Sequence, residues 1–175
     1  QYAEPPASFG SDGQKIRTPD RILDGRVATC LDLAMLFASA FAAGLHCAVL
    51  FKEGHAWVGV WLHSACFPDP LTDDVLAVRK RVDSGEFLVF ETTGVAQHHS
   101  RRPSLRIATE QGRAHLLEEE SFRFAVDIHR AREVQIKPLP SKAALVKRQE
   151  AGDAEEPLAI EPTPVLPPLD PAFLT

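Results

Sequence analysis

Three side chains that together can carry out nucleophilic catalysis occur in this sequence in the order Cys30, His55 and Glu91. A cysteine attacks as its thiolate, a histidine takes and returns the proton, and a carboxylate orients the histidine by accepting its second N–H. The sequence around each residue must therefore predict an element that can bring the three together.

The stretch that begins with Thr29 and Cys30 predicts a helix that starts at the cysteine. Thr29 is a suitable N-cap, apolar residues then recur three and four positions apart, and Gly44 is a suitable stop. The first turn of a helix favours negative charge and lowers the pKa of a thiol there, and Asp32 reinforces the same helix end electrostatically. Alone, however, Cys30 also fits the role of a small buried apolar residue.

Two strand predictions place the other two residues. Segments 46–52 and 55–62 alternate as strands and are joined by a Glu-Gly pair, which predicts an antiparallel hairpin that puts His55 at the start of its second strand. Trp57 and Trp61 share the His55 face, where they either wall the site or pack in the core. Segment 86–93 predicts a third strand with Glu91 near its end, and adjacent antiparallel strands can bring His55 and Glu91 together.

The remaining elements complete a predicted α+β fold in which the cysteine-bearing helix packs on a mostly antiparallel sheet. A short helix follows Thr18 and ends at Gly25, and segment 71–85 predicts a helix capped by Thr72 or Asp73 with an apolar stripe. A longer helix over 105–120 is weakened by Gly112, and a strand is predicted over 122–128. The stripe expected for the helix over 71–85 consists of Val75, Leu76, Val78 and Val82.

Three stretches resemble the transglutaminase-like branch of the papain-like cysteine peptidase superfamily. ATCLDLAMLFASAFAAGL is similar to the cysteine helix of that family, GHAWVGVWL to its histidine strand and FLVFETT to its acid strand, over residues 28–93. The resemblance implies that Cys30 is the nucleophile, His55 the base and later the acid, and Glu91 the orienting carboxylate. The sequence departs from the family at Ala28, where glycine is usual, and at Glu91, where aspartate or asparagine is common.

A second resemblance covers residues 14–140. QKIRTPDRILDGRVATCLDLAMLFASAF, together with FRFAVDIHRAR and IKPLP, is similar to an uncharacterised N-terminal module of large bacterial proteins that carry a superfamily 1 helicase and often a nuclease-like part. This resemblance implies a bacterial, cytoplasmic, helicase-associated domain and a longer parent chain, whose helicase or nuclease portion is a possible partner. The first residue, Gln1, fits a piece of such a chain.

Composition sets the limits of the domain. The chain has 175 residues, 45% hydrophobic and 25% charged, which suits one folded domain. We expect a loose segment over 1–13, the domain over 14–140, and a disordered proline-rich acidic linker or tail over 141–175. No apolar run is long enough for a membrane span. A net charge of −5 does not indicate that the chain as a whole binds nucleic acid. Three widely spaced cysteines favour free thiols in a reducing compartment.

The sequence therefore predicts a cysteine hydrolase of peptidase or amidase type acting on a peptide or protein, with acyl transfer open to the same residues. The alternative is an inactive module of the same fold that binds a peptide or protein or docks within its parent. No cofactor is expected, because the sequence has no nucleotide phosphate loop. No metal is expected either. His46, Cys47, His63 and Cys66 offer soft ligands, but no second paired motif completes four ligands at the spacing typical of structural zinc. For the oxyanion we expect the Cys30 N–H and, as a weaker candidate, Gln14.

Overall fold

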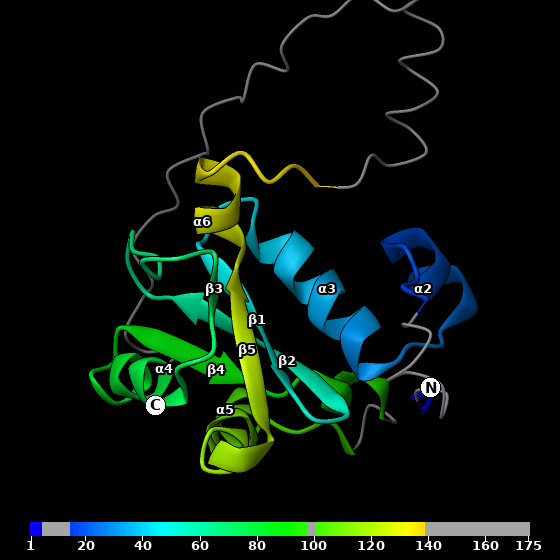
Figure 1. The fold of residues 1–175 in the computed structure, drawn as a ribbon. Helices are drawn as coiled ribbons and strands as arrows, with labels where there is room; N and C mark the ends of the chain where they lie inside the picture. Colours follow the sequence, from blue (N-terminus) through cyan, green and yellow to red (C-terminus); the bar gives the residue numbers. More distant parts are fainter. Residues whose placement is uncertain (5–14, 98–100, 139–175) are drawn as a thin grey trace, which may run out of the picture.

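The computed structural model describes residues 1–4, 15–97 and 101–138. Its centre is a five-stranded antiparallel sheet in the order β3-β5-β1-β2-β4, with helices on both sides (Figure 1). The predicted α+β class with a mostly antiparallel sheet is confirmed. The strands are β1 Cys47–Lys52, β2 His55–Trp61, β3 Leu71–Thr72, β4 Phe87–Phe90 and β5 Phe122–Asp127.

Helix α3, Cys30–Phe41, packs on one face of the sheet and helix α4, Val75–Asp83, packs on the other. The other helices are α2 Pro19–Gly25, α5 Leu105–His115 and α6 Ile128–Glu133, with short 3-10 turns over Thr93–Ala96 and Glu119–Ser121. Helix α5 lies against the edge strand β4, where a Cβ atom at Gly112 would come within 2.7 Å of the Phe90 backbone. The glycine that weakens α5 as an isolated helix thus permits its close approach to β4.

Strands β1 and β2 form the predicted hairpin, in which Lys52 and His55 are the paired residues next to the turn. Gly54 turns the chain with a φ of +68°, a conformation that glycine adopts without strain. The alternation along β2 also follows the prediction: Trp57 lies in the core on the α4 side of the sheet, whereas Val58 lies in the core under α3. His55 opens a strand whose next six residues are buried, so its position is well fixed.

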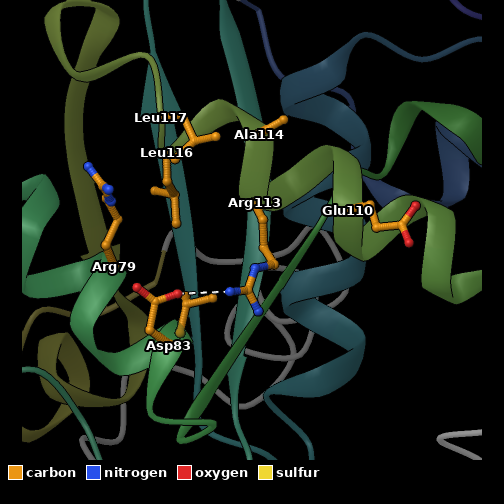
Figure 2. Close-up of a pocket in the computed structure, with 8 residues that line it drawn as sticks. Arg79, Asp83, Glu110, Arg113, Ala114, Leu116 and Leu117 are labelled. Carbon is orange, nitrogen blue, oxygen red and sulfur yellow. Dashed lines mark hydrogen bonds and ion pairs between the residues drawn. The ribbon is translucent and has the colours of Figure 1, made fainter.

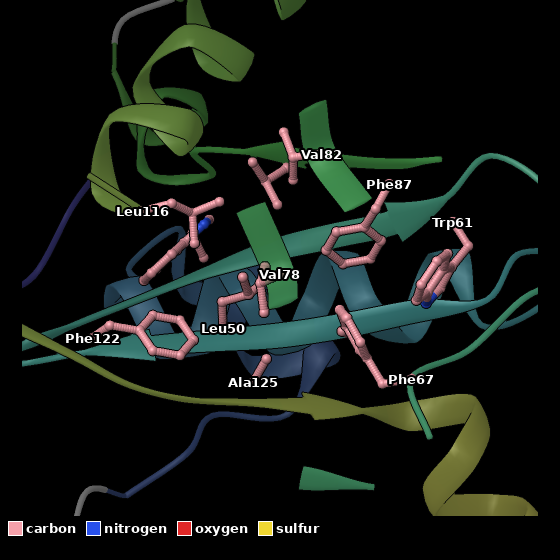
Figure 3. Close-up of a cluster of buried hydrophobic side chains, with 12 residues drawn as sticks. Leu50, Trp61, Phe67, Val78, Val82, Phe87, Leu116, Phe122 and Ala125 are labelled. Atoms are coloured by element: carbon pink, nitrogen blue, oxygen red, sulfur yellow. The ribbon is translucent and has the colours of Figure 1, made fainter. Parts of the chain in front are cut away.

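The core on the α4 side is rich in aromatic residues (Figure 3). Phe87 is 1% exposed, and its ring occupies the space that a side chain at position 59 would need, which explains Gly59 in β2. At one end of this core the buried carboxylate of Asp127 accepts hydrogen bonds of 3.0 Å from the Trp61 indole and from the Phe67 backbone. These bonds satisfy a polar group that would otherwise be costly to bury.

Several expected boundaries are corrected. Helix α4 is capped by Asp74, whose Oδ1 accepts from the Leu76 and Ala77 N–H groups, instead of by Thr72 or Asp73. Leu76 is 58% exposed and does not belong to the apolar stripe. Helix α5 ends at His115 instead of reaching residue 120, because Leu116 turns into the core.

Two further features differ from the predictions. Helix α6 follows β5 directly, with the Asp127 side chain as its cap. Residues 1–4, expected to be loose, lie beside Ala28, where the Ala3 N–H donates to the Ala28 carbonyl over 2.9 Å. The expected tail over 141–175 lies outside the described residues, as do residues 5–14. Within the described ranges, no helix combines the length and apolarity that crossing a membrane requires.

Candidate active site

Cys30 is the first residue of α3, as the sequence predicts. The Asp32 N–H donates to the Thr29 hydroxyl over 3.2 Å, and the Asp32 carboxylate accepts from the Thr29 N–H over 2.9 Å, which together form a capping box. Asp32 is completely buried and also accepts 2.7 Å bonds from the backbone and the guanidinium of Arg17. The expected role of Asp32 at the helix N-terminus is thus confirmed, and it also ties down the segment before α2.

The strand pairing brings His55 and Glu91 into direct contact. Strand β4 runs antiparallel to β2 with Val58 opposite Phe90, so that the residue after Phe90 lies near the start of β2. The His55 Nε2 and the Glu91 Oε2 are 2.6 Å apart, and Glu91 is buried at 8% exposure. Glu91, although one methylene longer than aspartate, therefore places its carboxylate at hydrogen-bond distance from the imidazole.

The thiol of Cys30 completes the chain of contacts. It is hydrogen-bonded to the His55 ring, and since Nε2 faces Glu91, the nitrogen left for the thiol is Nδ1. Burial alone would raise the pKa of the Cys30 thiol, but its hydrogen bonds to His55 and to the Ala56 N–H hold that pKa below its ordinary value. Burial would lower the pKa of His55, but hydrogen bonds to Cys30 and Glu91 raise it to about 9. These opposite shifts favour transfer of the thiol proton to the imidazole.

Glu91 has a second histidine partner that the sequence interpretation missed. His115, the last residue of α5, donates from Nε2 to the Glu91 Oε2 over 2.8 Å, and the Thr93 N–H donates to Oε1 over 2.8 Å. Burial would raise the pKa of Glu91, but the hydrogen bonds from His115 and His55 keep it well below its usual range. Nothing in the local sequence marks His115, because its contact with Glu91 depends on how α5 packs against β4.

Of the two tryptophans that share the His55 face in the sequence, Trp57 borders the site. Trp57 is fully buried, and its indole lies 6.2 Å from the His55 ring, between centroids, at an angle of 13°. Trp57 therefore packs in the core and also lies beside the site, so it has both of the roles that the sequence suggested. Trp61 lies farther along β2 and packs in the core against Phe67 and Phe87.

The Tyr2 hydroxyl donates a hydrogen bond to the Cys30 thiol. Tyr2 belongs to the N-terminal segment that lies beside Ala28. Burial and the nearby Cys30 thiol raise the pKa of Tyr2 to about 12, so the phenol remains a hydrogen-bond donor at neutral pH. The Cys30 N–H lies in the first turn of α3, where backbone N–H groups have no acceptor within the helix. Gln14, the other candidate for oxyanion binding, lies outside the described residues.

A hollow of about 520 Å³ lies beside the thiol. Its lining includes the half-buried pair Phe51 and Phe124, whose ring centroids are 4.8 Å apart. Such a volume is typical of pockets for small molecules or a few peptide side chains. The lining residues are Cys30, Leu31, Phe51, Lys52, Glu53, Gly54, His55, Ala56, Arg123 and Phe124.

A second hollow of about 330 Å³ lies between α4 and α5 (Figure 2). The ion pair between Arg113 and Asp83, 2.8 Å long, closes part of it, and Leu116 and Leu117 line another part. None of Cys30, His55 and Glu91 lines this second hollow, so the hollow beside the thiol is the one that matters for chemistry at Cys30.

The described residues bring together one group of metal-ligating types, namely His55, Glu91 and His115, with one ligand atom of each within 4.8 Å of the others. The two N–O distances of 2.6 and 2.8 Å are hydrogen-bond lengths. Around zinc, with bonds of about 2.0–2.2 Å, tetrahedral ligand atoms lie roughly 3.3 Å apart, so this group would have to open to hold the metal.

Two of the residues that the sequence offered as soft ligands, His46 and Cys47, are engaged elsewhere. His46 stacks on His129 with centroids 3.4 Å apart and makes a 2.6 Å hydrogen bond to the Ala65 carbonyl. The Cys47 thiol is buried and donates to the Ala38 carbonyl over 3.4 Å.

Comparison of the chain with protein-family models, with curated proteins and with solved structures gave no match. The geometry of the site itself therefore carries the functional interpretation.

Proposed function

We propose that this domain is a cysteine hydrolase of peptidase or amidase type in the transglutaminase-like branch of the papain-like superfamily. The observation that carries the proposal is the continuous contact from the Cys30 thiol through the His55 ring to the Glu91 carboxylate. Cysteine on a helix start, histidine on a following strand and acid after the next strand is the arrangement on which the sequence resemblance rests. The parent chain proposed with this assignment is a bacterial, cytoplasmic, helicase-containing protein.

In the proposed reaction, the Cys30 thiolate attacks an amide carbonyl carbon, which forms a C–S bond and a tetrahedral oxyanion. Protonated His55 gives its proton to the leaving nitrogen as the C–N bond breaks, which leaves a thioester on Cys30 and a neutral imidazole. The imidazole then takes a proton from water, whose oxygen attacks the thioester. The C–S bond breaks, the acid product leaves, and the thiolate and imidazolium are restored. An amine in place of water gives acyl transfer by the same steps.

The proposed substrate is a peptide or protein with an apolar side chain near the reacting carbonyl. Because Cys30 and the aromatic pair Phe51 and Phe124 line the same hollow, an acyl group on the thiol lies within reach of that pair. Burial of apolar substrate surface there is favourable by roughly 25 cal/mol for each Å².

A second candidate is a non-catalytic module of the same fold that binds a peptide or protein, or docks within its parent. The observation that favours it is the cover over the nucleophile: Cys30 is only 3% exposed, and the Tyr2 hydroxyl lies against its thiol. In this case, the polar contacts of Cys30 and His55 serve structure or recognition.

The experiment that separates these functions is the pH dependence of Cys30 alkylation by iodoacetamide in the native domain. Cys47→Ser and Cys66→Ser are combined as the background, so that one thiol is measured, and His55→Ala is compared with it. The hydrolase predicts an apparent pKa below the ordinary 8.5 or so of a free thiol, and a rise in that pKa when His55 is removed. An unreactive or ordinary thiol that His55→Ala leaves unchanged would favour the binding module instead.

A further inference from the structure

We infer that His115 is a positioning residue that holds the Glu91 carboxylate in the orientation that His55 requires. This role rests on the proposed function for its effect on catalysis, but the contact between His115 and Glu91 is independent of the reaction. His115 itself acts on Cys30 only through Glu91 and His55.

Three donors from different segments fix the Glu91 carboxylate. Its Oε2 accepts from His55 of β2 and from His115 of α5, over 2.6 and 2.8 Å. Its Oε1 accepts from the Thr93 N–H, over 2.8 Å, in the turn that follows β4. With both oxygens occupied, the carboxylate cannot rotate about its last torsion without breaking a hydrogen bond.

Glutamate needs this restraint more than aspartate does. It has one more rotatable bond, so its carboxylate sweeps a larger volume and loses more conformational freedom when it is held. A displacement of about 1 Å in a positioned catalytic group can cost as much as 100-fold in rate. The contact from His115 therefore offsets the extra methylene by which Glu91 departs from the usual acid of the family.

His115 is itself held firmly enough to act as a reference point. Its ring centroid lies 5.1 Å from that of Trp57 and 4.8 Å from that of His55. Helix α5, which carries it, is in close contact with the β4 backbone through Gly112. The position of His115 is therefore set by β4, the strand that directly precedes Glu91.

The charged groups around His115 come from three segments. Glu91 faces its Nε2, and Glu118 lies 4.0 Å from its Nδ1. Lys52 of β1 binds Glu118 over 2.9 Å and partly balances that carboxylate. Glu118 and Lys52 must be retained in every variant that tests His115, whereas Glu91 is replaced only in the control.

Loss of His115 has two opposing effects on His55. A carboxylate with one donor fewer is a stronger acceptor for the His55 N–H, which favours the imidazolium. The same carboxylate is also free to turn towards solvent, which removes the orienting bond. We expect the second effect to dominate, because His115 and His55 share one oxygen and only the Thr93 N–H restrains the other.

The test compares His115→Phe with His115→Gln in the Cys47→Ser, Cys66→Ser background. Phenylalanine keeps a ring against Trp57 but donates no hydrogen bond, whereas glutamine keeps an N–H donor. The readouts are the Cys30 alkylation rate as a function of pH and the pKa of His55 from its ring NMR signals. We expect His115→Phe to lower the rate at pH 7 about threefold, no more than Glu91→Gln does, and to lower the pKa of His55, whereas His115→Gln should stay close to the parent in both readouts.

Glu91→Gln supplies the matched control. If His115 acts through Glu91, His115→Phe has no further effect on either readout once Glu91 is replaced. Equal effects in both backgrounds, or an unchanged pKa of His55 in folded His115→Phe, would overturn the inference. An ordinary thiol in the parent protein would count against the proposed hydrolase, and the pKa of His55 would still decide the role of His115.

Discussion

Cys30 and Cys47 are both buried, at 3% and 1% exposure, yet their thiols have opposite character. The pKa of Cys47 is raised to about 11, because it is buried and because the Asp127 carboxylate lies nearby. The pKa of Cys30 is lowered although burial opposes this, since His55 and the Ala56 N–H are its hydrogen-bond partners. Burial alone therefore does not make a cysteine of this chain inert or reactive; the donors around the sulfur decide.

The strongest test of this comparison is selective alkylation. With a small reagent at pH 7, we expect Cys30→Ser to remove nearly all rapid labelling of the native protein and Cys47→Ser to remove almost none. Mass spectrometry of digested protein identifies the labelled residue. Cys66 is half-buried, with a pKa raised by burial and by Asp127, so it should label more slowly than Cys30. Labelling of Cys47 as fast as that of Cys30 would show that the two sites do not differ as described.

Removing the base should make Cys30 resemble an ordinary thiol. An unperturbed thiol is roughly 3% ionised at pH 7, but a thiolate of low pKa is intrinsically less nucleophilic. We therefore expect His55→Ala to lower the alkylation rate at pH 7 about tenfold and to move the midpoint of the pH profile upward. His129→Ala, on α6, is the matched control and should leave the profile unchanged. A profile that His55→Ala does not move would contradict a Cys30–His55 pair.

Removing the charge of Glu91 should have a smaller effect on the same rate. In Glu91→Gln, the pKa of His55 should fall from about 9 towards its ordinary 6.5, because two of the causes that raise it come from Glu91. We expect the alkylation rate at pH 7 to fall about threefold to fivefold. NMR titration of His55 measures the pKa directly, and a value that stays near 9 would assign the shift to Cys30 alone.

The smallest effect on the thiol should come from the cap of α3, where the change is mainly in stability. Asp32→Asn weakens a capping box and a buried contact with Arg17, and we expect the free energy of unfolding to fall by about 1–3 kcal/mol. The pKa of Asp32 is lowered in the folded state, because hydrogen bonds from Arg17 and Thr29 outweigh its burial.

The contribution of Asp32 is therefore complete above its ordinary pKa of about 3.9 and is lost as the pH falls through its folded value. Urea unfolding at pH 7 and at pH 3 measures both effects. The difference between wild type and Asp32→Asn should shrink at the lower pH, and a constant difference would show that the charge of Asp32 is not the cause.

Local patterns predicted the elements that hold the nucleophile and the base. Thr29 and the helical period placed Cys30 at a helix start, and the alternation after Gly54 placed His55 and Trp57 on one face of a strand. These features depend on neighbours in sequence, which explains why they were predictable. The contact of Glu91 with His55 follows from the pairing of β2 with β4, which the order of the strands suggested.

Features that depend on tertiary packing escaped prediction. His115 reaches Glu91 only because α5 lies against β4. The sequence alone indicates that Gly112 weakens the helix, whereas in the fold it is the point at which α5 approaches β4 closely. The cap of α4 was misplaced because Thr72, Asp73 and Asp74 all suit that position locally. The pairing of Tyr2 with Ala28 likewise depends on where the first residues lie in space.

The wide sequence separation of the site residues has a consequence for folding. His55 and Glu91 are 36 residues apart and meet only when β4 has paired with β2, after the chain has passed through α4. Contacts of this range form late, because they require the closure of a long loop. A nascent or partly unfolded chain therefore carries an ordinary thiol at Cys30. Its alkylation rate at neutral pH can thus serve as a built-in reporter of whether the complete sheet has formed.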